Sequence, residues 1–84
     1  MARPIITISE SEFARLVKFE IPGGVCTPEE ASESVAAVVK ELPGDKPALL
    51  NGRGPVWLYA MLVHAAHPTP AIATFDPRLG YVVV

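Results

Sequence analysis

The feature that most constrains this chain is a nearly apolar run at residues 55–66. A helix needs about 20 apolar residues to cross a bilayer, so this run is too short to be a membrane span. It must instead be covered by protein, in a chain of 84 residues of which 50% are hydrophobic. A chain of this size buries only about 60% of its unfolded surface. We therefore expect one domain, residues 1–84, that forms a homodimer through helix–helix contacts.

Proline and glycine divide the chain into two helices and five strands. Thr27 is a favourable N-cap, the proline after it suits the first helical position, and Glu30 completes a capping box. This first helix is expected to run to Leu42, with one apolar stripe, and to end at the breakers in residues 43–45. The second helix is the apolar run itself, which ends where His67 precedes a proline.

Alternating apolar and polar residues indicate the strands. In residues 15–21, Val17, Phe19 and Ile21 share one face, as in a half-buried strand. The resulting order, ββαβαββ, predicts an α+β fold with both helices on one face of a mostly antiparallel sheet, best fitted by a ferredoxin-like variant. The strands are expected at residues 4–8, 15–21, 47–50, 71–75 and 81–84.

Charge and cysteine content exclude several classes of protein. A net charge of −2 and a pI near 5.6 are incompatible with a broad basic face for DNA or long RNA. The N-terminus lacks the pattern of a secretory signal. The single cysteine, Cys26, cannot form an internal disulfide, so we expect a reducing cytoplasm and a buried, inert thiol. Neither a membrane nor DNA is expected as a partner.

A glycine-rich turn, residues 51–54, connects a predicted strand to the second helix. Free backbone N–H groups at a helix start bind anions, and Arg53 adds a positive charge. Asn51, Gly52, Arg53 and Gly54 are therefore candidates for phosphate binding. The alternative is a tight connection whose glycines only satisfy backbone geometry, and the turn by itself favours that alternative.

The only two histidines and one acidic turn are the remaining candidates. His64 and His67 lie three residues apart, on one side of the helix end, where they could bind a metal, transfer protons or simply favour the helix dipole. Asp76 and Arg78 flank a proline in a turn that could hold a metal ion and a phosphate, or only shape the turn.

The order of the elements separates these candidates. The strands before the glycine-rich turn and before Asp76 should run the same way, so both turns lie at one edge of the sheet. His67 should lie at the other edge, roughly 20 Å away across a strand of about six residues. A pocket that uses both edges would need two subunits.

Several blocks of residues together resemble one known family. They are Gly52-Arg53-Gly54-Pro55-Val56-Trp57-Leu58-Tyr59, Leu62-Val63-His64, His67-Pro68-Thr69 and Ala73-Thr74-Phe75-Asp76-Pro77-Arg78-Leu79-Gly80, with residues 21–25 and 27–29 in the N-terminal half. These blocks are similar to the Csx-three family, also called Crn-three, of small type III CRISPR proteins. The resemblance covers nearly the whole chain, and the first and last blocks are specific.

The resemblance implies a ferredoxin-like dimer that stacks into a tetramer or filament around cyclic tetra-adenylate, which it cleaves to linear di-adenylate with Mn²⁺. The family's catalytic residues match His67, Asp76 and Arg78, and a further histidine matches His64. Metal ligands would come from His67, Asp76 and His64. Family members also carry a histidine beyond the last strand, linked to the metal site, that has no counterpart among these 84 residues.

Three other functions are compatible with the same sequence. The first is a Mn²⁺-dependent exonuclease that removes 3′ adenylates from RNA. The second is a module that binds cyclic oligoadenylate without hydrolysis. The third is an oligomeric scaffold, which the acidic pI and the apolar helix would equally permit.

Overall fold

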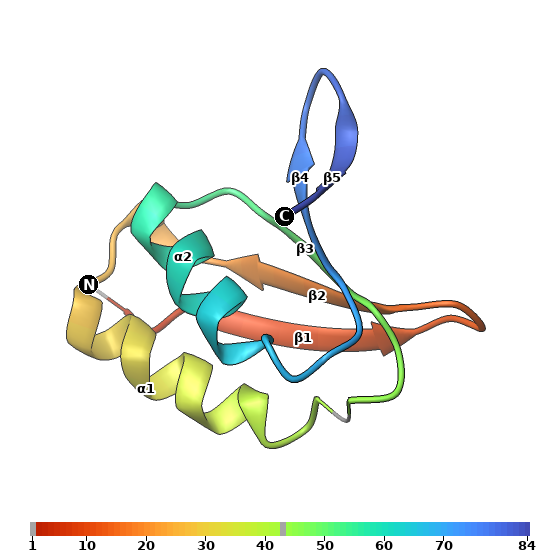
Figure 1. The fold of residues 1–84 in the computed structure, drawn as a ribbon. Coiled ribbons are helices and arrows are strands. Elements are labelled where there is room, and N and C mark those ends of the chain that lie inside the picture. Colours follow the sequence, from red (N-terminus) through yellow and green to blue (C-terminus); the bar gives the residue numbers. More distant parts are fainter. Residues whose placement is uncertain (1, 43) are drawn as a thin grey trace.

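A computed structural model describes residues 2–42 and 44–84 of the chain as one sheet with two helices (Figure 1). The predicted α+β class and the order ββαβαββ are confirmed. In chain order the elements are β1 (Ile5–Glu10), β2 (Arg15–Glu20), a short 3-10 helix η1 (Pro22–Gly24), α1 (Pro28–Val39), β3 (Ala48–Gly52), α2 (Val56–Ala65), β4 (Ile72–Asp76) and β5 (Gly80–Val83).

The sheet is mixed, so the prediction of a mostly antiparallel sheet is wrong. The five strands lie in sequence order, with antiparallel pairing of β1 with β2 and of β4 with β5. In contrast, β2 with β3 and β3 with β4 pair in parallel. The cause is the helices, because each one carries the chain back to the edge where the preceding strand began. The three parallel strands are direct neighbours, and the ferredoxin-like topology is not confirmed.

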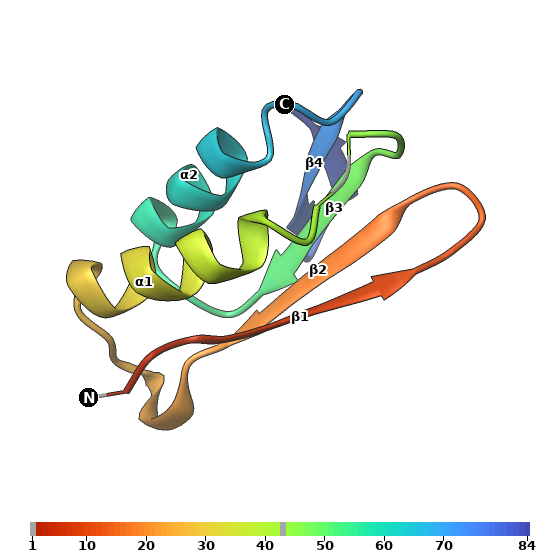
Figure 2. The same cartoon turned by 90° about the horizontal axis from the view of Figure 1, so that it is seen from below.

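Both helices cover the same face of the sheet, as predicted (Figure 2). Successive crossovers of one hand, in strands that follow each other in order, place their helices on one side. The core between the layers contains Val17 and Leu50, both fully buried, and Leu58 of α2, also fully buried. The alternation predicted for residues 15–21 is confirmed, since Phe19 and Ile21 are buried in the same core.

Helix α1 begins as predicted and ends earlier than predicted. The Thr27 hydroxyl accepts a hydrogen bond from the Glu30 amide, and the Glu30 carboxylate accepts one from the Thr27 amide. The helix ends at Val39 because the next residues close tighter turns, in which the Leu42 amide donates to the Val39 carbonyl at 3.2 Å. Pro43, expected to help end the helix, lies outside the described residues.

Helix α2 shares its apolar surface between the sheet and α1. Leu58 and Leu62 are buried, whereas Met61 and Ala65 are only partly buried. Among the described residues, no helix is long and apolar enough to span a membrane.

The face of the sheet opposite the helices is uncovered in one chain (Figure 2). The register brings Leu16 of β2 beside Leu49 of β3, and Phe75 of β4 beside Tyr81 of β5, on this face. Phe75 and Tyr81 pack edge to face with ring centroids 5.4 Å apart, and both remain more than a third exposed. A second apolar surface, in addition to α2, is thus available for a partner.

An ion-pair network ties the β1–β2 turn to the loop before β3. The Arg15 guanidinium contacts the carboxylates of Glu10 and Asp45 at 2.6 Å each. The hydrogen bond from Arg15 holds the pKa of Asp45 below its usual value, and the same bond raises the pKa of Arg15. Lys46 adds a longer contact to Glu10, at 3.4 Å.

Candidate functional site

The glycine-rich turn and the Asp76 turn lie at the same edge of the sheet, as predicted. Strands β3 and β4 pair in parallel, with Leu50 opposite Thr74, so both turns follow the carboxyl ends of neighbouring strands. The Asn51 side chain also reaches β5, where its amide nitrogen donates to the Tyr81 hydroxyl at 3.1 Å. Asn51 therefore links the glycine-rich turn to β5, the strand that follows the Asp76 turn.

Packing against Phe19 shapes the glycine-rich turn. A Cβ at Gly52 would meet the Phe19 carbonyl oxygen and lie 2.6 Å from the ring carbon Cγ. A Cβ at Gly54 would lie 2.8 Å from Cε2 of the same ring. The glycines are needed because the chain passes this close to β2, and neither has a positive φ. The alternative predicted from the sequence, a tight connection between strand and helix, thus describes the backbone of this turn correctly. Phosphate binding by the turn stays a prediction.

Tyr59 holds the same turn from the side of α2. Its hydroxyl donates to the Gly52 carbonyl at 2.6 Å and accepts from the Gly52 amide at 3.1 Å. Its ring packs edge-on against Phe19, with centroids 4.9 Å apart. Sequence reasoning missed this role. The available signal was a tyrosine in the first helical turn after a glycine-rich connection, where its hydroxyl can reach back to that connection.

The start of α2 differs from the start of α1. Pro55 occupies the N-cap position of α2 and makes no side-chain capping bond, whereas α1 has a complete capping box. The first N–H groups of a helix have no partner within the helix and carry a partial positive charge. Arg53, two residues earlier, is exposed, and no carboxylate among the described residues forms an ion pair with it. This end of the turn therefore offers free donors to an anion, with the Glu20 carboxylate also in the lining of the adjoining groove.

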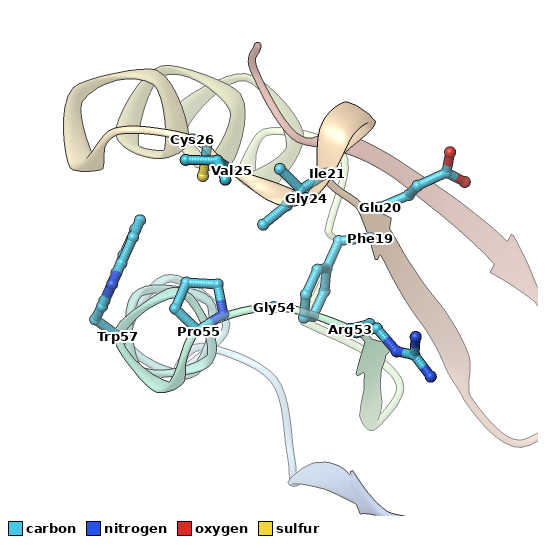
Figure 3. Close-up of a pocket in the computed structure, with 10 residues that line it drawn as sticks. All are labelled: Phe19, Glu20, Ile21, Gly24, Val25, Cys26, Arg53, Gly54, Pro55 and Trp57. Atoms are coloured by element: carbon cyan, nitrogen blue, oxygen red, sulfur yellow. The ribbon is translucent and has the colours of Figure 1, made fainter. Parts of the chain in front are cut away.

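A groove of about 640 Å³ opens beside the turn, between residues 19–26 and residues 53–57. Figure 3 shows Val25 and Cys26 on one side and Trp57 on the other, with Arg53 at the far end. Cys26 is only partly buried, so the prediction of a buried thiol is wrong. The cause is the extended segment that follows η1, which runs along the groove.

The Asp76 turn is closed by its own carboxylate. Asp76 Oδ1 accepts hydrogen bonds from the amides of Arg78 at 2.7 Å and Leu79 at 3.0 Å. Gly80, with φ of 80°, completes the reversal into β5. The side chain of Arg78 is exposed and extends from the edge that carries Arg53. The turn-forming role of Asp76 is therefore observed, and Oδ2 remains as the oxygen with which it could bind a ligand.

The two histidines lie at the other edge, where α2 ends. Their rings are roughly parallel, with centroids 6.2 Å apart, and His67 Nδ1 lies 3.1 Å from the His64 carbonyl oxygen. Both side chains are exposed and border a groove of about 410 Å³ between α1 and α2. The histidines precede strand β4 (Ile72–Asp76), and Asp76 is the last residue of that strand. The four residue steps of β4 alone span about 13 Å.

One chain does not bring the predicted metal ligands together. Among residues 2–42 and 44–84, no group of three or more His, Cys, Asp or Glu side chains is placed to hold a metal ion. His64 and His67 form a pair, and Asp76 is across the sheet from them. A manganese ion bound by His67, His64 and Asp76 of the same chain does not fit this geometry.

Comparisons with known proteins agree with the resemblance of the motifs. Residues 27–84 match a family model described as CRISPR-associated protein (Cas_csx3), the family called Csx-three above. The chain is also 39% identical over 69 residues to an uncharacterized protein of Aquifex aeolicus (strain VF5). That match covers 82% of this chain and 62% of the relative, so this chain spans about three fifths of the relative's length.

Proposed function

Because the chain belongs to the CRISPR-associated Csx-three family, we propose that it is a ring nuclease that cleaves cyclic oligoadenylate, with cyclic tetra-adenylate as its substrate. The carrying observation is that the family match includes the glycine-rich turn, both histidines and the Asp76 turn. Cleavage to linear di-adenylate would end the signal that such rings carry. The proposal includes metal dependence and assembly into dimers that stack into tetramers or filaments.

Two exposed arginines and a helix start at one edge support phosphate binding. Arg53 and Arg78 are both exposed at the carboxyl edge of the parallel strands, next to the uncapped start of α2. Guanidinium groups and helix N-terminal amides are the donors that suit phosphate oxygens. Two arginines at one edge can bind a few phosphate groups, as in a small nucleotide. A long nucleic acid would need a broader basic surface than this acidic protein has.

The proposed chemistry needs little beyond positioning and proton transfer. The ribose 2′-hydroxyl loses its proton to solvent and attacks the adjacent phosphorus, and the bond to the leaving 5′-oxygen breaks, which leaves a 2′,3′-cyclic phosphate end. His67 is suited to give a proton to the leaving oxygen. Arg78 is suited to stabilise the negative charge that develops on the phosphate.

The separation of His67 from Arg78 argues for a site shared between two chains. Within one chain the two side chains lie at opposite edges of the sheet. A substrate held by the Asp76 turn of one copy could meet His67 only from another copy. The uncovered sheet face and the apolar α2 provide surfaces for that assembly.

Manganese is part of the proposal through the family resemblance. His67 and Asp76 of one chain lie at opposite ends of β4, too far apart to bind one ion, so a metal held by both would need ligands from two chains. We derive no catalytic step through it.

The first experiment measures cleavage. Radiolabelled cyclic tetra-adenylate is incubated with the protein and Mn²⁺, with and without EDTA, and the products are separated by chromatography. We expect di-adenylate that disappears with EDTA. Linear poly(A) is assayed in parallel, because shortening of poly(A) with the ring intact would identify a deadenylating exonuclease instead.

The second experiment tests whether the site is shared. His67→Ala and Asp76→Asn are each expected to be inactive, whereas an equimolar mixture regains activity. In a dimer with two shared sites, random mixing restores about a quarter of the parent activity. A Glu12→Ala chain, changed at an exposed residue outside both turns, α2 and the uncovered sheet face, serves as the control. An inactive mixture, or an active monomer, would contradict the shared site.

One observation favours a second candidate, a module that binds the ring without cleaving it. The described residues contain no preformed metal-binding group. Tight binding of cyclic tetra-adenylate that remains intact in excess Mn²⁺ would select this candidate over the nuclease.

A further inference from the structure

The groove beside the glycine-rich turn has two chemically different ends. One end is apolar, with Trp57 facing Val25 and Cys26 across the opening (Figure 3). The other end carries the Arg53 guanidinium and the Glu20 carboxylate, both of which point toward solvent (Figure 3). Its volume, about 640 Å³, is in the range of pockets that bind small organic ligands.

We propose that this groove binds a nucleobase, stacked on Trp57, of the nucleotide whose phosphate lies at the Arg53 turn. The inference rests on the proposed function for the phosphate, and adds the site of the base. It assigns binding roles to Trp57 and Val25, neither of which belongs to the phosphate site.

Charge and shape together favour a nucleotide as the occupant. Arg53 forms no ion pair with Glu20 or with any other described carboxylate, so an apolar ligand alone would leave its guanidinium unpaired, and a free phosphate would leave the apolar walls unused. A nucleotide has a planar aromatic part and an anionic part, and so offers a partner to the apolar end of the groove and to Arg53. Stacking on an aromatic side chain contributes to binding for every base, and most for the larger purines.

The geometry of α2 supports the same occupant. Trp57 stands in the first turn of the helix, and the Gly52–Gly54 turn directly precedes that helix. Tyr59 and Phe19 fix the turn by contacts to Gly52 and Gly54. The stacking surface and the phosphate site are therefore connected rigidly. A ligand that contacts both loses little binding free energy to ordering of the protein.

The chain carries its own reporters for the test, because it has one tryptophan and one cysteine and both line the groove. In EDTA, linear tetra-adenylate is titrated against Trp57 fluorescence, beside an abasic ribose-phosphate tetramer of equal length. We expect quenching, and a dissociation constant roughly five- to a hundredfold lower for tetra-adenylate than for the abasic tetramer. Bound tetra-adenylate should also slow alkylation of Cys26, whereas the abasic tetramer should not.

Variants test the same point by calorimetry. Trp57→Leu is expected to weaken tetra-adenylate binding roughly five- to a hundredfold and to leave binding of the abasic tetramer unchanged. Val56→Ala, at the exposed neighbouring position, should change neither. Because Val25 is 57% exposed, Val25→Gln should fold normally, and it should weaken tetra-adenylate binding even if Trp57→Leu does not fold.

Each contrary outcome has a distinct meaning. Equal affinity for tetra-adenylate and the abasic tetramer, or no effect of both variants, overturns the base site and leaves the phosphate site intact. No binding of either ligand overturns this inference; if cyclic tetra-adenylate is also left intact in the cleavage assay with Mn²⁺, the proposed function fails with it. If Trp57 emission and Cys26 reactivity depend on protein concentration and not on nucleotide, a second copy fills the groove, and the inference is wrong.

Discussion

Substitution of Gly54 tests whether the aromatic ring of Phe19 sets the shape of the glycine-rich turn. A Cβ at Gly54 would lie 2.8 Å from Phe19 Cε2 and 3.3 Å from Ile21 Cδ1. The ring cannot simply move away, because Phe19 is 5% exposed and packs on Tyr59. Crowding of this kind costs ~1–3 kcal/mol. Loss of glycine flexibility in the unfolded chain offsets ~0.4–1 kcal/mol of that cost.

We therefore expect Gly54→Ala to lower the free energy of unfolding by about 1–2 kcal/mol. For a domain of this size that corresponds to a decrease of the melting temperature by about 4–16 °C. The measurement is urea denaturation followed by circular dichroism. The phosphate binding proposed for the turn should weaken in parallel, since the backbone around Arg53 must shift.

A double-mutant cycle with Phe19→Leu identifies the cause. Removal of the ring removes the atom that the new methyl group meets, so Gly54→Ala should cost little in the Phe19→Leu background. Gly52→Ala provides the matched contrast, because the Phe19 carbonyl oxygen is in its way and remains after the ring is gone. If the effects of Gly54→Ala and Phe19→Leu add within about 0.5 kcal/mol, the ring does not determine the glycine, and the reasoning is wrong.

Three further predictions concern the elements that position the site. Tyr59→Phe removes both hydrogen bonds to Gly52 and should lower the free energy of unfolding by about 1–3 kcal/mol. Hydrogen exchange of the Gly52 amide, measured by mass spectrometry, should become faster. Unchanged exchange would contradict the role of Tyr59 in holding the turn. Thr27→Ala should cost about 1 kcal/mol in urea denaturation through loss of the capping box, with no change in Trp57 fluorescence. Asp45→Asn should destabilise the protein at neutral pH, because Arg15 holds the pKa of Asp45 below its unfolded value. The difference in free energy of unfolding between variant and parent should vanish as the pH falls through that lowered pKa. A difference that persists at lower pH would refute this assignment of the ion pair.

Local signals in the sequence were sufficient to predict the helices and strands and their order along the chain. The capping box of Thr27 and Glu30 is a short-range pattern, and the structure contains both of its hydrogen bonds. The alternation of residues 15–21 also depends on neighbours in sequence, and it correctly identified the buried face. Direction along the chain was enough to place the glycine-rich turn and Asp76 at one edge and His67 at the other.

Pairing between distant segments could not be predicted in the same way. The sequence gives no local signal for which strand lies beside β3, and the expected mostly antiparallel sheet proved to be mixed. The partial burial of Cys26 likewise depends on where residues 19–26 pass the start of α2. The hydroxyl of Tyr59 reaches Gly52 only because a helical turn follows the tight passage beside Phe19.

The amino-acid sequence by itself determined the family, the two turns and the direction in which each element runs, because these depend on motifs and on neighbours along the chain. Tertiary structure alone decided that Phe19 restricts Gly52 and Gly54 and that a groove forms between residues 19–26 and 53–57. The physical reason is that close approach and cavities arise from side chains far apart in sequence, whose distances are fixed only when the sheet has assembled.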